Sequence, residues 1–99
     1  MPSNAARLRR YIAEADLYGL RLAVAELAGR TEATINCRQV VSQGAPVDQT
    51  AVQRGLRMAA VAGLVETDSR ATKKGIWVRV LDPGGLAAAV ALDPRQAAG

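Results

Sequence analysis

Four polar side chains recur at helical spacing within residues 47–66, VDQTAVQRGLRMAAVAGLVE, and none of them is acidic. They are Thr50, Gln53, Arg54 and Arg57. Guanidinium and amide groups form paired hydrogen bonds with the edges of bases, and guanidinium and hydroxyl groups also bind phosphate oxygens. This set of side chains is therefore suited to binding a nucleic acid.

The same stretch contains the signals of a helix that presents those side chains on one face. Asp48 is suited to the N-cap, where its carboxylate accepts a hydrogen bond from a free backbone N–H. Gly63 is suited to the C-terminal end, because glycine adopts the left-handed cap conformation without steric cost. The other face is small or aliphatic, with Val52, Leu56, Ala59 and either Val61 or Ala62. We therefore predict an amphipathic helix over residues 48–62.

Length and charge limit the class of protein. A chain of 99 residues forms one domain with a thin core, and this one contains no Phe. Its 13 Lys and Arg exceed its 9 Asp and Glu, which gives a formal net charge of +4. The stretch from Arg38 to Arg79 has seven bases and three acids, so the excess lies there. A basic middle suits a polyanionic partner, although many proteins with other partners are equally basic.

Several functions find no support in the residue types. The chain has no His and a single cysteine, Cys37, which we interpret as a structural thiol in a helix; we expect no disulfide and no metal site. No nucleophile motif or phosphate-binding loop is present, so we predict neither an enzyme nor a cofactor. We expect no signal peptide, because the N-terminus is polar and Arg-rich, and no apolar run approaches membrane-spanning length. We expect a cytoplasmic protein without membrane contact.

Helices are expected before the basic stretch. The first covers residues 5–18, capped by Ser3 or Asn4, and the second covers residues 20–30. Gly19 leaves open whether the two are separate or form one bent helix, since a glycine costs a helix only about 1 kcal/mol relative to alanine. A very short strand at 31–36 and a short helix at 37–43 follow.

A β-hairpin is expected after Gly63. Residues 64–67 begin one strand, residues 68–75 are polar and loop-like, and IWVRVL at 76–81 alternates as a half-buried strand does. Asp82, Pro83 and the two glycines after them are expected to end it. The apolar run 86–92 has the composition for one or two turns of helix, and residues 93–99 are expected to fray.

Residues 47–65 resemble the third helix and following strand of bacterial winged helix-turn-helix transcription regulators, which often read V-S-x-S-T-V-x-R-A-L-x-x-L-x-x-x-G-L-V. The matching positions are Val47, Asp48, Thr50, Val52, Arg54, Leu56, Ala59, Gly63, Leu64 and Val65. The resemblance extends over about residues 20–81. Pro46 stands where a glycine is common and Ala59 where a leucine is usual, so the subfamily is not assigned.

The resemblance implies an α+β fold, mainly α, with a winged helix-turn-helix and an extra N-terminal helix. Residues 1–99 would form a single winged-helix domain. Within it, residues 1–18 would be the N-terminal helix, residues 20–82 the winged-helix core and residues 83–99 a C-terminal tail.

The implied function is sequence-specific binding of double-stranded DNA by a small transcriptional regulator. The helix at 48–62 would enter the major groove, and the wing at 68–75 would lie on the backbone or in a minor groove. The candidate DNA-binding residues are Arg38, Ser42, Gln49, Thr50, Gln53, Arg54, Arg57, Arg70, Lys73 and Lys74. A homodimer is expected, with the Leu8, Tyr11 and Ile12 stripe or the 86–92 run as its interface.

Two other interpretations use the same surface. The chain could be a winged-helix adaptor that binds protein within a nucleoprotein assembly, or an accessory protein of DNA replication or segregation. The polar residues could also be no more than a solvated helix face and a soluble turn. The operator and the direction of regulation are left open by the sequence.

Overall fold

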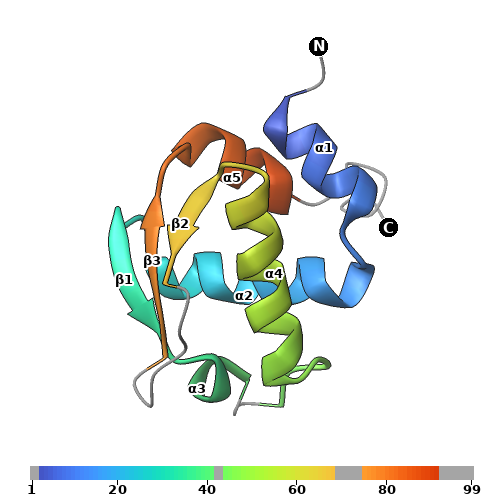
Figure 1. Ribbon diagram of the computed structural model, residues 1–99. Coiled ribbons are helices and arrows are strands. Elements are labelled where there is room, and N and C mark those ends of the chain that lie inside the picture. Colours follow the sequence, from blue (N-terminus) through green and yellow to red (C-terminus); the bar gives the residue numbers. More distant parts are fainter. Residues whose placement is uncertain (1–2, 42–43, 69–74, 92–99) are drawn as a thin grey trace.

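The computed structural model of the chain describes residues 3–41, 44–68 and 75–91. In these ranges it has five helices and a three-stranded antiparallel sheet (Figure 1). The helices are α1 (Asn4–Tyr11), α2 (Glu14–Leu27), α3 (Cys37–Val41), α4 (Gln49–Val61) and α5 (Pro83–Val90). The strands are β1 (Glu32–Ile35), β2 (Val65–Thr67) and β3 (Ile76–Val80). The predicted α+β, mainly helical class is confirmed.

The sheet has the strand order β1-β3-β2, with both pairs antiparallel. Ile35 pairs with Ile76, and Val65 pairs with Val80, so the central strand is the last in sequence. Ile76 and Val78 are buried on the helix-covered face, while Arg79 is exposed on the other. The predicted short strand and the predicted hairpin, with its alternating inward face, are both confirmed.

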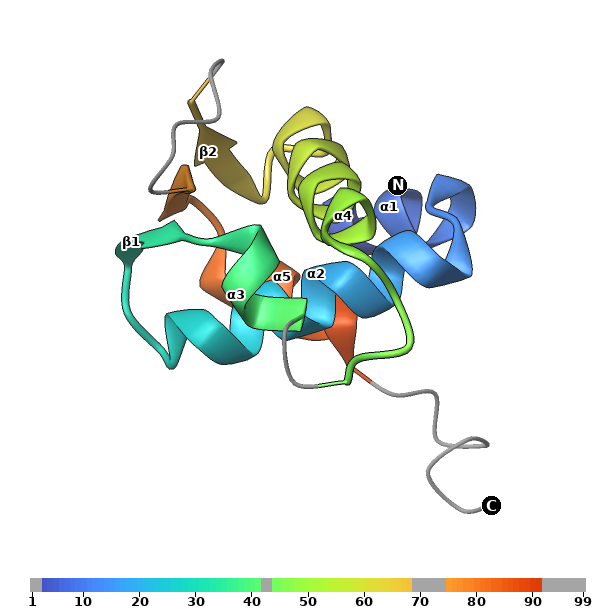
Figure 2. The same cartoon turned by 90° about the horizontal axis from the view of Figure 1, so that it is seen from below.

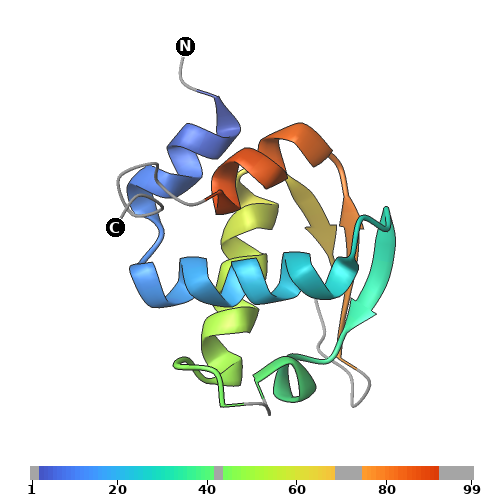
Figure 3. The same cartoon turned by 180° about the vertical axis from the view of Figure 1, so that it is seen from behind.

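Apolar side chains from all eight elements form one core. Figure 3 shows α2 crossing the molecule, with α4 behind it, α1 and α5 beyond one side, and the sheet at its far end. Leu20, Leu56, Leu64 and Val78 have no accessible surface. The rest of the core consists mainly of Ala, Val, Leu and Ile side chains, as a chain without Phe requires.

The break between the first two helices was predicted in the wrong place. The backbone becomes extended at Ile12 and Ala13, α2 starts at Glu14, and Gly19 is a buried residue inside a continuous helix. The expected helix over residues 1–18 is therefore two helices, and the chain neither kinks nor breaks at Gly19. Glu14 and Asp16 occupy the first turn of α2, where acidic side chains favour the positive end of the helix dipole.

The segment expected to be a tail begins with a helix that belongs to the core. Asp82 caps α5 by accepting a 2.9 Å hydrogen bond from the N–H of Gly85, and Pro83 occupies the first turn. Leu86 and Ala89 are buried, and α1 and α5 pack against each other. Residues 93–99, predicted to fray, lie outside the described ranges.

The surfaces expected to be spare for dimerisation are therefore largely used inside one chain. Leu8 retains only 3% of its accessible surface, although Tyr11 from the same predicted stripe is 73% exposed. Two arginines fasten the end of α5. Arg21 Nε donates to the carbonyl of Val90 at 2.6 Å, and Arg9 donates to the carbonyl of Ala91 at 3.2 Å. Cations at a helix C-terminus also complement its dipole.

Candidate nucleic-acid interface

The helix α4 has the predicted caps at both ends. Asp48 is extended and its Oδ1 accepts a 3.1 Å hydrogen bond from the N–H of Ala51. At the other end Gly63 has φ +80°, and the N–H of Leu64 donates to the carbonyl of Ala59 at 2.9 Å. This Schellman arrangement satisfies carbonyls that the helix leaves unpaired and turns the chain into β2.

The two faces of α4 are divided as the sequence predicts. Val52, Leu56 and Ala59 are fully buried, and Ala51 and Gly55 lie on the same side. The choice that the sequence left open is resolved in favour of Ala62, which is half-buried, because Val61 is 89% exposed. The helix is therefore attached to the core by one face along most of its length.

The opposite face of α4 carries the candidate ligand-binding side chains. Gln49, Thr50, Arg54 and Arg57 are exposed, and Gln53 is half-buried. Asp48 at the start of the helix is occupied as the cap. Asp16 of α2 lines the same hollow as Arg54, yet no ion pair joins these two described residues. The carboxylate of Asp16 therefore lowers the positive potential of this face without forming an ion pair with Arg54.

Among the nine described arginines, those that serve the fold can be told apart from those on the candidate interface; Arg7 and Arg10 of α1 belong to neither set. One group serves the fold through hydrogen bonds or an ion pair: Arg9, Arg21, Arg30 and Arg79. In the described part of the chain, no hydrogen bond or ion pair engages the guanidinium of Arg38, Arg54 or Arg57. These three guanidinium groups have their donors available for a ligand.

α3 lies beside α4 at the same end of the molecule. Figure 2, which views the molecule from below, shows α3 and the start of α4 in front of α2. Arg38 is exposed on α3. At the start of this helix the side chain of Asn36 accepts a 3.0 Å hydrogen bond from the backbone N–H of Gln39. Ser42, predicted to contact DNA, lies outside the described residues. The structure thus places Arg38 and the α4 side chains on neighbouring helices.

Cys37 is the buried thiol that joins α3 to the core. Burial raises its pKa, and this effect exceeds the opposing effects of a backbone hydrogen bond and of the positive charge of Arg57. The thiol is 5% exposed, as expected for a structural cysteine.

The described part of the hairpin carries one basic side chain, Arg79. The three wing bases, Arg70, Lys73 and Lys74, lie outside the described residues. On the outer face of the sheet Arg79 forms a 2.7 Å ion pair with Glu66 and lies 6.0 Å from the centroid of the Trp77 ring. Both partners of the ion pair are about half exposed, so it contributes at most about 1 kcal/mol.

One residue that positions the site was missed in the sequence. Gly55 lies inside the continuous helix α4, between Arg54 and Leu56, and it is buried against α2. A glycine inside a helical pattern often has a packing reason, and that signal was present. The sequence does not show which part of α2 Gly55 contacts, because that depends on how the two helices pack in three dimensions.

The remaining properties bear on the class of protein. In the described ranges, no group of three or more His, Cys, Asp or Glu is arranged to hold a metal ion. None of the helices in that part of the chain has the length and apolar character needed to cross a membrane. No protein-family model and no curated protein matches the chain.

Proposed function

We propose that the chain is a winged helix-turn-helix protein that binds double-stranded DNA and acts as a small transcriptional regulator. The observation that carries the proposal is the exposed face of α4, on which Arg54 and Arg57 have no partner in the described part of the chain. Guanidinium groups held on one helix face can donate two hydrogen bonds each to guanine O6 and N7. Thr50 and Gln49 at the helix start are placed for phosphate or base contacts.

The arrangement of elements supports this proposal. The order α2–β1–α3–α4–β2–β3, with the sheet order β1-β3-β2, is compatible with a winged helix. α3 and the start of α4 lie at the end of the molecule toward which β2 runs and from which β3 departs (Figure 1). A wing at residues 68–75 would then contact the backbone or a minor groove beside the recognition helix.

Selection of bound sites from random double-stranded DNA tests the proposal directly. We expect enrichment of one short motif that contains guanines, because Arg54 and Arg57 are the strongest base-reading groups on the face. If the protein acts as a dimer, the motif should recur as two half-sites about one helical turn apart. Absence of any enriched motif, with folded protein, would contradict the proposal and would favour a protein as the ligand of α4.

A further inference from the structure

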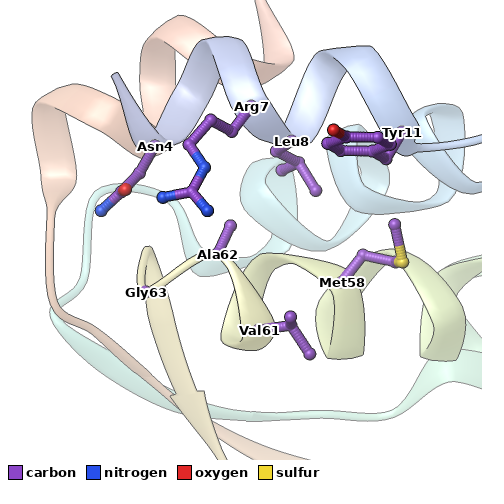
Figure 4. A pocket seen from close by; sticks show the side chains of 8 residues that line it. All are labelled: Asn4, Arg7, Leu8, Tyr11, Met58, Val61, Ala62 and Gly63. Atoms are coloured by element: carbon purple, nitrogen blue, oxygen red, sulfur yellow. The ribbon is translucent and has the colours of Figure 1, made fainter. Parts of the chain in front are cut away.

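A groove of about 450 Å³ separates α1 from the C-terminal half of α4 (Figure 4). Leu8 and Tyr11 face it from α1, and Met58 and Val61 from α4. Figure 4 shows Tyr11 above Met58, and Val61 at the edge of the groove, on α4 and directed away from α1. The groove lies at the opposite end of α4 from its capped start, so its lining is separate from Gln49 and Thr50.

The apolar lining of this groove is unusually exposed. Four large apolar or aromatic side chains of the described residues are exposed: Tyr11, Tyr18, Val61 and Leu81. Two of the four, Tyr11 at 73% and Val61 at 89%, line this one groove, and half-buried Met58 lies between them. Adjacent apolar side chains left in water mark a binding surface more often than scattered ones do.

The charge around these apolar residues is positive. Arg7 extends from α1 over the groove (Figure 4), and no acidic residue is among the described residues that line it. The guanidinium of Arg7 has no hydrogen bond or ion pair within the described ranges. On the other side of Val61 a smaller hollow is bordered by Arg54 and Arg57, with Asp16 as its acid. An aromatic residue, a methionine and arginines are the composition that protein interfaces favour.

We propose that this groove binds a short amphipathic segment of another protein, whose apolar anchors cover Tyr11, Met58 and Val61 and whose carboxylate pairs with Arg7. A groove with one wall from each of two helices suits an amphipathic segment laid between them. A small molecule in the groove would leave most of Val61 in water, whereas a segment along the edge of the groove covers it. A two-fold contact between copies would bring two such grooves together, and neither lining would supply an acid to pair with Arg7.

This inference does not depend on DNA binding. A displayed library of random peptides, selected on the full chain, supplies the probes. We expect enriched peptides to carry apolar residues at i and i+3 or i+4 together with Asp or Glu. Fluorescence anisotropy of one such peptide should show affinity at least about tenfold weaker for Val61→Glu and for Arg7→Glu. Replacing the peptide's acid with Lys should restore binding to Arg7→Glu.

The matched control is Leu81→Glu, which places the same charge on another exposed apolar residue. It should leave the peptide affinity unchanged, and thermal unfolding should show that all variants remain folded. Enrichment of no peptide, enrichment of basic peptides, or binding that is indifferent to Val61→Glu would overturn the proposal. So would sedimentation in which the parent is a dimer and Val61→Glu is a monomer, because the occupant would then be a second copy.

Discussion

Gly19 of α2 and Gly55 of α4 both lie where the two helices cross, and each leaves room for the backbone of the other helix. A Cβ on Gly19 would lie 2.5 Å from the carbonyl carbon of Ala51 and 2.6 Å from the nitrogen of Val52. A Cβ on Gly55 would overlap the carbonyl oxygen of Asp16 and lie 2.9 Å from the nitrogen of Leu20. The position of α4, and so of its exposed face, depends on this contact.

Replacing either glycine with alanine should therefore destabilise the protein, although alanine is the better helix former. The gain in helix propensity is about 1 kcal/mol. Overpacking against backbone, which cannot rotate away as a side chain can, typically costs about 1–3 kcal/mol or more. We expect a net loss for Gly55→Ala and Gly19→Ala, measured by urea unfolding.

The control for the two glycine variants is Gly84→Ala in the first turn of α5. The nearest atom to a Cβ there is Asp82 Oδ1 at 3.9 Å, so this substitution meets no obstacle. It should leave the free energy of unfolding unchanged or raise it slightly. Equal stability of Gly55→Ala and the parent would show that α2 and α4 can separate without cost.

Asp48→Ala should lower the free energy of unfolding by about 1 kcal/mol, because the N–H of Ala51 loses its side-chain acceptor. Asp48→Asn should retain most of the stability, since an amide oxygen also caps a helix. Asp68→Ala removes the same charge from an exposed position outside any helix and serves as the control. Equal losses for Asp48→Ala and Asp48→Asn would assign the effect to charge rather than to the cap.

Stability should fall at alkaline pH because of Cys37. Burial raises its pKa in the folded protein, so the unfolded chain loses the thiol proton first. The contribution of the neutral thiol is complete below the ordinary thiol pKa and is lost as pH rises toward the folded value. Urea unfolding of the parent and of Cys37→Ala from neutral to alkaline pH should show a steeper decline for the parent. Parallel curves would contradict this.

The sequence was sufficient where residue type decides the structure locally. Asp48 and Gly63 marked the ends of α4, and the alternation of Ile76, Trp77 and Val78 marked a strand with one buried face. The break at residues 12–13 could not be predicted, because extended backbone there is open to any residue type. Gly19 was misinterpreted for a different reason: its role is set by the backbone of α4, which lies far along the chain.

The candidate site could be predicted only in part. The exposed side of α4 follows from helical periodicity, and the structure places all five of its predicted residues outward or half-buried. Periodicity does not reveal which arginines form hydrogen bonds within the fold. Arg9 and Arg21 donate hydrogen bonds to the end of α5, which is far from both in the sequence. Arg54 and Arg57 have no such partner within the described ranges. That distinction requires the tertiary structure.

The wing bases give a prediction that rests on the sequence, since they lie outside the described residues. Lys73→Ala with Lys74→Ala should weaken binding to all DNA sequences alike. The plot of log affinity against log salt should become shallower by about 0.9 for each phosphate that the variant no longer neutralises, because fewer counterions are released. Titrations at several salt concentrations measure this slope. An unchanged slope would remove the wing from the interface.

Arg54→Ala and Arg57→Ala should each keep the fold and lose discrimination between a selected site and random DNA. Both side chains are exposed and without a partner in the described part of the chain, and alanine is the best helix former. Each loss should be about 1–3 kcal/mol of discrimination, confined to particular base pairs of the site. Lysine should not fully rescue either position, because an ammonium lacks the planar fork that matches guanine's two acceptors. Arg10→Ala, which removes an exposed charge from α1, should preserve the preference, and a similar preference in all three alanine variants would contradict the recognition role of α4.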